Sequence, residues 1–193
     1  MRTVIATDFD GTLTRRDTLI EFIRFAKGDV GFLFGFLLFS PLIVLMKLHL
    51  YPNWKTKQKV FSYFFRGTSI EEFNRLGKEF ADNSQHLLRW GGIELVEKAK
   101  AEGADIVVIS ASIDNWVQPF FPELLVLGTQ VEVKDGLLTG RFSTKNCYGQ
   151  EKVNRLLSVF PDRENYRLVA YGDSSGDRKL LDFADEQHYK PFQ

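Results

Sequence analysis

Short runs of β-branched and aliphatic residues recur along the chain, a pattern typical of buried strands. These runs cover residues 3–7, 106–109, 124–127 and 167–171, and an edge strand is expected at 188–190. Apolar residues at helical spacing alternate with them over 93–100, 150–159 and 179–183. Strands alternating with helices predict an α/β fold with a doubly wound, mostly parallel sheet. Asp135–Gly136 is a typical turn dipeptide and predicts a hairpin over 131–141.

A long segment with little strand character separates the first strand from the helix near Ile93. Eleven of the 18 phenylalanines lie in it, between Phe22 and Phe80. A capping box at 69–72 begins a helix with Phe73 and Phe80 on one face. We therefore expect a helical cap domain at 15–91, inserted into a catalytic core made of 1–14 and 92–193.

Residues 30–46 of this segment contain no charged residue. One interpretation is a soluble cap in which two helices bury this face against each other. The other is contact with a membrane surface, through an interfacial or re-entrant hairpin. Residues expected to break a straight helix are Gly31, Gly35, Ser40 and Pro41, and lysines that would suit anionic lipid are Lys47, Lys55, Lys57 and Lys59. The sequence leaves both interpretations open.

Net charge and cysteine content exclude few classes of binding partner. Lysine plus arginine equals aspartate plus glutamate, 25 each, so no global field favours nucleic acid. Cys147 is the single cysteine, which excludes an intramolecular disulfide and favours the cytoplasm, where the protein could also lie at the inner face of the membrane. No obligate protein partner is indicated.

Acidic and hydroxyl side chains follow three of the predicted strands. The pairs are Asp8 with Asp10, Ser110 with Ser112, and Asp173 with Asp177. In a parallel sheet such strand ends meet at one rim, where ligands bind. Asp10–Gly11 could instead simply form a turn, with Asp8 capping the next helix.

The catalytic interpretation explains more of these residues. An aspartate at a strand end can attack phosphorus, and a second one can protonate the leaving oxygen. Asp173 could join Asp8 around Mg²⁺, which prefers oxygen ligands. Lys152 could hold phosphate as a point charge, and Ser110 with the amide of Ala111 offers neutral donors.

Residues 8–14, DFDGTLT, resemble the first motif of the haloacid dehalogenase superfamily. Ser110 resembles its second motif, Lys152 its third, and residues 172–177 its fourth. The resemblance implies that Asp8 is the nucleophile and Asp10 the general acid/base. It also implies that Asp8, the main-chain carbonyl of Asp10 and Asp173 bind Mg²⁺ with support from Asp177. The phosphate-binding residues expected from it are Thr12, Ser110, Ala111 and Lys152.

The position of the insert resembles the helical cap of phosphoserine phosphatase-like members. Asp17 and Lys59 stand where those enzymes have a glutamate and an arginine, so both are candidate specificity residues. Gly176 stands where they usually have asparagine. The apolar cap also resembles that of bacterial phosphatidylglycerophosphate phosphatases of this superfamily.

We therefore predict a Mg²⁺-dependent phosphomonoesterase that acts through an aspartyl-phosphate on a small phosphorylated metabolite. The alternative is a lipid-phosphate phosphatase whose cap touches the membrane. A third hypothesis, a catalytically silent binding protein, is disfavoured because the nucleophile and the metal aspartate are both present.

Overall fold

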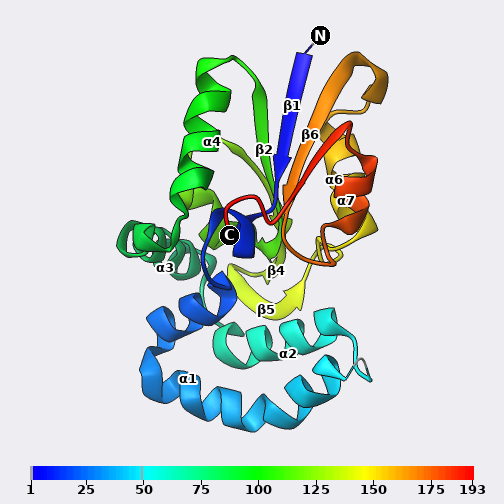
Figure 1. Ribbon diagram of the computed structural model, residues 1–193. Helices are drawn as coiled ribbons and strands as arrows, with labels where there is room; N and C mark the ends of the chain where they lie inside the picture. The colour runs from blue at the N-terminus through cyan, green and yellow to red at the C-terminus, as the bar shows by residue number, and fades with distance from the viewer. Residues whose placement is uncertain (1, 49) are drawn as a thin grey trace.

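The computed structural model describes residues 2–48 and 50–193 (Figure 1). The central sheet and the helices and turns around it are β1 (Arg2–Thr7), the turn η1 (Phe9–Leu13), α4 (Trp90–Ala101), β2 (Asp105–Ile113), α5 (Asp114–Val117), η3 (Gln118–Phe120), β3 (Leu125–Thr129), α6 (Gln150–Val159), η4 (Arg163–Asn165), β6 (Tyr166–Gly172), α7 (Arg178–Phe183) and β7 (Glu186–Tyr189). The remaining elements are α1 (Thr18–Lys47), α2 (Asn53–Phe65), α3 (Ile70–Asn83), η2 (Gln85–Leu87), β4 (Val131–Lys134) and β5 (Leu137–Phe142).

Five parallel strands form the central sheet in the order β3-β2-β1-β6-β7. Successive residues of β1 face opposite sides, so Ile5 joins one hydrophobic cluster while Val4 and Ala6 join another. Helix α4 supplies Val96 to the first cluster, and α6 supplies Leu156 to the second. Helices on both faces of a parallel sheet confirm the doubly wound α/β fold.

Several local predictions are confirmed in detail. Asp135 and Gly136 both have positive φ, 51° and 77°, and join β4 to β5 as the predicted hairpin. Helix α6 has the predicted bounds. Strand β2 is longer than predicted, because it continues past a register irregularity between Ile109 and Ile113. The edge strand β7 begins and ends earlier than predicted.

The sequence prediction placed the helix break in the apolar segment at the wrong residues. Gly31 and Gly35 are helical, and Pro41 lies inside α1. The non-helical residue is Gly28, with φ 71° and ψ 166°, a conformation that glycine adopts without steric cost. The apolar run is therefore one continuous helical segment after Gly28, and no re-entrant hairpin forms within it.

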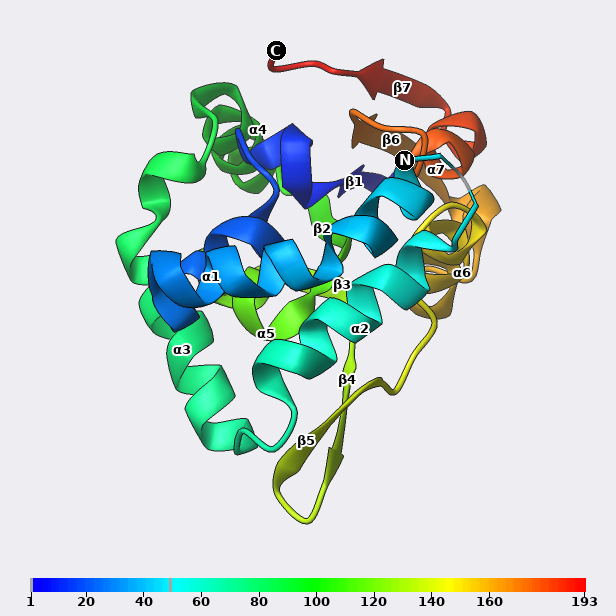
Figure 2. The same ribbon diagram turned by 90° about the horizontal axis from the view of Figure 1, so that it is seen from below.

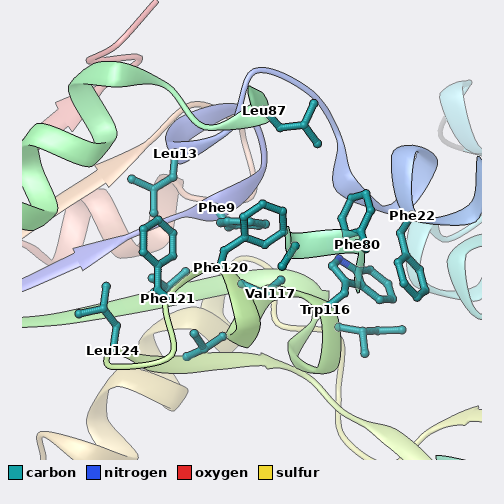
Figure 3. Packing of buried hydrophobic residues seen from close by; sticks show 14 of the residues in the cluster. Phe9, Leu13, Phe22, Phe80, Leu87, Trp116, Val117, Phe120, Phe121 and Leu124 are labelled. Carbon is teal, nitrogen blue, oxygen red and sulfur yellow. The ribbon is translucent and has the colours of Figure 1, made fainter. Parts of the chain in front are cut away.

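An aromatic cluster ties the inserted helices to the core (Figure 3). The ring of Phe22 in α1 stacks on Trp116 of α5 at 4.7 Å and meets Phe65 and Phe80 at 5.4 Å each. The β4–β5 hairpin also contacts the insert, since Gly67 N–H donates to the Leu138 carbonyl at 2.8 Å. The division into a core and a cap at 15–91 stays a prediction. The β4–β5 hairpin, which the prediction assigns to the core, lies against the inserted helices.

Candidate active site

The carboxyl ends of the strands bring together acidic side chains from distant parts of the sequence. Asp8 directly follows β1, and its N–H donates to the Tyr171 carbonyl of β6 at 2.9 Å. Carboxylate oxygens of Asp8, Asp173 and Asp177 all lie within 4.8 Å of one another. The parallel topology predicted this meeting, because adjacent parallel strands end at the same edge.

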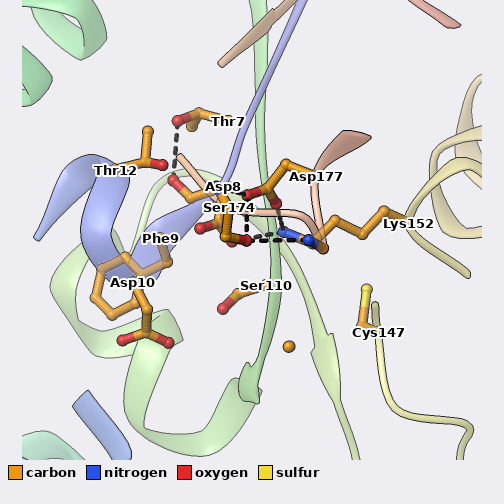
Figure 4. A network of polar contacts seen from close by, with 12 residues as sticks. Thr7, Asp8, Phe9, Asp10, Thr12, Ser110, Cys147, Lys152, Ser174 and Asp177 are labelled. Atoms are coloured by element: carbon orange, nitrogen blue, oxygen red, sulfur yellow. Dashed lines mark hydrogen bonds and ion pairs between the residues drawn. The ribbon is translucent and has the colours of Figure 1, made fainter. Parts of the chain in front are cut away.

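A buried lysine bridges two of these carboxylates (Figure 4). Lys152, only 2 % exposed, places its Nζ 2.5 Å from Asp8 Oδ1 and 2.5 Å from Asp177 Oδ1. Burial and the negative charge of Asp177 raise the pKa of Asp8 to about 8, although Lys152 opposes this shift. The two carboxylates hold Lys152 in its charged form by raising its pKa. Lys152 therefore extends from α6 and holds its positive charge next to Asp8, at the end of β1.

The loop after β6 is held in place by Asp177. Its Oδ2 accepts hydrogen bonds from the N–H groups of Asp173 and Ser174, at 3.2 and 2.9 Å, and from the Ser174 hydroxyl at 2.8 Å. Lys152 lowers the pKa of Asp177, against the effect of burial. Asp177 thus orients this loop and contributes only its other oxygen to the acidic cluster.

The turn after Asp8 approaches Asp173 very closely. A Cβ at Gly11 would lie 2.3 Å from Asp173 Oδ2, and φ at Gly11 is +81°, so only glycine fits here. Thr12 is predicted to bind phosphate, but its buried hydroxyl donates to Asp173 Oδ1 at 3.3 Å, and the residue does not line the cavity. The hydroxyl of Thr12 therefore contacts Asp173, and a role of Thr12 in phosphate binding stays a prediction.

Asp10 points away from the cluster around Lys152 (Figure 4). Its Oδ1 accepts hydrogen bonds from the N–H and hydroxyl of Thr18, at 2.7 and 2.6 Å. Its Oδ2 accepts one from the Ser112 hydroxyl at 2.5 Å. Thr18 at the start of α1 and Ser112 in β2 therefore position Asp10, a role that the sequence analysis did not predict. The only signal in the sequence was the spacing of Ser112 from Ser110.

A cavity of about 710 Å³ lies between the strand ends and the inserted helices. Asp8, Asp10, Ser110, Ala111 and Lys152 all line it, as predicted for one site. Its opposite wall contains the apolar side chains Phe36, Ile43 and Met46 of α1, and the basic residues around it are Arg15, Arg16, Lys47, Lys57 and Arg89. The cavity thus has a polar floor and a partly apolar roof.

The two predicted specificity residues have different outcomes. Asp17 caps α1 and lines the cavity. Lys59 does not line it, because this exposed lysine projects over the ring of Tyr51. Lys57 occupies the site instead and donates to the Ala111 carbonyl at 2.6 Å. Burial lowers the pKa of Lys57, while Asp17 and Asp10 oppose the shift.

Tyr148 is another cavity residue that the sequence did not indicate. Its hydroxyl lies 2.9 Å from the Ser175 hydroxyl, and its ring packs over Gly176. A Cβ at position 176 would lie 2.4 Å from a ring carbon of Tyr148. The glycine that departs from the expected asparagine therefore makes room for the tyrosine ring.

The acidic cluster fits a hard divalent cation. Among residues 2–48 and 50–193, Asp8, Asp173 and Asp177 are the group of possible metal-ligating side chains found close enough together. All three offer carboxylate oxygen, and the absence of a side chain at Gly11 leaves room for the Asp173 carboxylate beside the turn. Mg²⁺ accepts such ligands, whereas a soft metal would need sulfur or imidazole.

The chain resembles a curated bacterial protein over nearly its whole length. It is 34 % identical over 197 residues to Protein CicA of Caulobacter vibrioides, covering 98 % of this chain and 86 % of that protein. A family model for haloacid dehalogenase-like hydrolases also matches residues 5–182.

Solved structures share the fold at low sequence identity. A Bordetella pertussis Tohama I protein of unknown function superposes with a TM-score of 0.84 at 17 % identity, covering 97 % of this chain and 89 % of that one. A substrate-bound phosphoserine phosphatase superposes with a TM-score of 0.69 at 19 % identity, covering 98 % and 86 %. Because the family model matches residues 5–182, the chain belongs to the haloacid dehalogenase-like hydrolase family.

Proposed function

We propose that the protein hydrolyses phosphate monoesters in a Mg²⁺-dependent reaction through a phosphorylated Asp8. The observation that carries this proposal is the position of the Asp8 carboxylate. It lies at the end of β1, on the floor of the cavity, in contact with Lys152 and close to the carboxylates of Asp173 and Asp177. A carboxylate that combines a fixed neighbouring cation with access to a cavity is suited to attack on phosphorus.

Asp8, Asp173 and the main-chain carbonyl of Asp10 are the groups that we assign to Mg²⁺, with Asp177 in support. When bound, the ion neutralises charge on the transferring phosphoryl oxygens and lowers the repulsion between phosphate and the carboxylates. Lys152 adds a positive charge of the protein itself next to Asp8. Ser110 and the amide of Ala111 offer neutral donors at the end of β2.

In the first step an Asp8 oxygen forms a bond to phosphorus while the ester P–O bond breaks. Asp10 gives a proton to the departing oxygen, and the alcohol leaves. In the second step Asp10 takes a proton from water, whose oxygen attacks phosphorus and releases inorganic phosphate and free Asp8. The hydrogen bonds from Thr18 and Ser112 hold the Asp10 carboxyl in one orientation for both steps.

The substrate that we propose first is a small phosphorylated metabolite. Asp17 and Lys57 add one negative and one positive group to the lining of the cavity. We also propose the cytoplasm as its compartment, because the single thiol, Cys147, is buried and unpaired.

A lipid phosphate is the second candidate. The observation that favours it is the apolar wall of Phe36, Ile43 and Met46, which offers no hydrogen bond to a sugar or an amino acid. Such a wall suits the acyl-glycerol part of a lipid better than a polar metabolite.

The deciding experiment measures phosphate release with Mg²⁺ and with EDTA. The panel contains p-nitrophenyl phosphate, phosphoserine, sugar and nucleotide monophosphates, and phosphatidylglycerophosphate in detergent. Turnover that EDTA abolishes and Mg²⁺ restores supports the proposed reaction, and the best substrate separates the two candidates. No turnover on any member, with beryllium fluoride also failing to bind at Asp8, would contradict it.

A further inference from the structure

The outer face of α1 carries a continuous apolar stripe. With the exposed Pro41, its members recur every three or four residues, which places them on one side of a helix: Val30, Leu33, Phe34, Leu37, Leu38, Val44, Leu45 and Leu48. Val30 is 70 % exposed, Phe34 66 % and Leu37 62 %. A contiguous exposed apolar surface of this kind marks an interaction site rather than a random surface.

The inner face of the same helix is occupied. A Cβ at Gly35 would lie 2.1 Å from the ring of Phe64 in α2, and Phe39 meets Tyr63 of α2 at 5.5 Å. Phe36 and Met46 line the catalytic cavity. Helix α1 is therefore apolar all round but covered on one side only, and an all-round apolar helix is normally buried on every side.

The helix lies against the molecule rather than standing out from it (Figure 2). It is long and apolar enough to cross a bilayer, and 6 % of its most apolar window is buried. Crossing would, however, require α1 to leave the groove against Phe64 and to open the cavity wall. An orientation in the plane of the membrane surface keeps both contacts and buries only the stripe.

Charge identifies the kind of surface that the stripe fits. Residues 30–66 contain five lysines and arginines and no aspartate or glutamate, in a chain whose charges balance overall. Lys55 and Lys59 are exposed on α2, beside α1, and the indole of Trp54 is also exposed. Apolar, aromatic and basic side chains together are typical of binding to anionic lipid. A second copy of the chain would instead bring two basic surfaces together.

We propose that the outer stripe of α1, flanked by the basic residues of α2, docks in the plane of an anionic lipid bilayer. Because α1 is also the cavity wall, docking holds the catalytic cavity about one helix diameter, roughly 10 Å, from the lipid surface. The docking itself is independent of catalysis. Delivery of a phosphorylated lipid to Asp8 rests on the proposed function.

Vesicle flotation of the full chain tests the docking. The wild-type protein is mixed with vesicles of phosphatidylcholine alone or of phosphatidylcholine with phosphatidylglycerol, at low and high salt. We expect it to float with the anionic vesicles, with less protein bound at high salt because the lysine contribution is screened. A wild-type protein that binds neither kind of vesicle would overturn the proposal.

Two matched triple variants locate the surface. Leu33→Gln with Phe34→Gln and Leu37→Gln should weaken binding to anionic vesicles about tenfold or more, because three apolar side chains no longer enter the lipid. The control, Trp90→Gln with Leu137→Gln and Val159→Gln, changes exposed apolar residues elsewhere and should bind like the wild type. Equal binding by the α1 variant, or a wild-type dimer that this variant makes monomeric without affecting vesicle binding, would contradict the proposal.

A separate readout keeps the two proposals apart. The α1 variant should hydrolyse p-nitrophenyl phosphate at the wild-type rate, since none of its three changed residues lines the cavity. Asp8→Asn protein should still float with anionic vesicles although it is inactive. Vesicle binding without turnover of any substrate would refute the proposed function alone, and turnover without vesicle binding would refute the docking alone.

Discussion

The floor of the cavity and the outer face of α1 depart in opposite ways from the usual rule that charged residues are exposed and apolar residues are buried. On the floor, charged groups are buried, and Lys152 pairs with both Asp8 and Asp177. On the outer face, apolar side chains are largely exposed, Val30 to 70 % and Phe34 to 66 %. Folding stability by itself favours neither arrangement. The comparison is consistent with the two proposals, in which a metal and phosphate complete the cavity floor and a lipid surface covers the outer face of α1.

Two phenylalanines of α1, one before and one after Gly28, show the same contrast within one helix. Phe22, before Gly28, is fully buried among aromatic rings, whereas Phe34 is 66 % exposed. The same residue type therefore stabilises the fold at one position and is free for binding at the other. Mutations can separate these uses.

The largest effect should follow loss of the nucleophile. Asp8→Asn should lower phosphate release from p-nitrophenyl phosphate by about 10⁴-fold or more, because no covalent intermediate can form. Circular dichroism should show an unchanged fold. Activity within tenfold of the wild type would exclude Asp8 as the nucleophile.

The same variant should lose less stability than the wild type as pH rises from about 4 to about 8 in EDTA. The folded-state pKa of Asp8 is raised from 3.8 to about 8, so ionisation opposes folding increasingly as pH rises through this range. Asn cannot ionise, and its stability should therefore fall less between these pH values. Thermal unfolding at several pH values, without metal, measures the difference.

Lys152→Gln tests the buried bridge on the cavity floor. Removing the cation leaves Asp8 and Asp177 uncompensated, which should cost about 3–5 kcal/mol of stability and most of the activity. The exposed Lys98→Gln is the matched control and should change stability by less than about 0.5 kcal/mol. Equal unfolding midpoints in urea for both variants would contradict the structural role of Lys152.

Phe22→Ala and Phe34→Ala compare the buried and exposed phenylalanines of α1. The first should cost about 3–5 kcal/mol in urea unfolding, since it leaves a cavity beside Trp116 and Phe65. The second should change stability by less than about 0.5 kcal/mol. Similar losses for both would mean that the outer face of α1 is packed in solution.

The smallest effect is expected at Lys57, which reaches the cavity floor from α2. Lys57→Gln should raise KM by about tenfold with a smaller change in kcat, because Lys57 lines the cavity but donates its hydrogen bond to the Ala111 carbonyl rather than to Asp8. Lys59→Gln is the control and should leave both constants unchanged. A lower kcat with unchanged KM would instead assign Lys57 to the chemical step.

Sequence alone determined the sheet, the strand ends and the core of the site. Buried strands leave a strong local pattern, and the parallel topology then carries Asp8, Ser110 and Asp173 to one rim whatever the loops do. The aspartates of residues 8–14 were identifiable because the motif is local. The Asp135–Gly136 turn was identifiable because positive φ restricts the residue types.

Tertiary structure alone decided the groups that reach the site from the inserted helices. Lys57 and Lys59 differ by two positions, so a rotation of the helix decides which one enters the cavity, and no local pattern encodes that rotation. The role of Thr12 depended on the position of Asp173, far along the chain. The apolar run of 30–46 looked the same from every side in the sequence, and only packing against α2 and the cavity revealed which half of α1 stays uncovered.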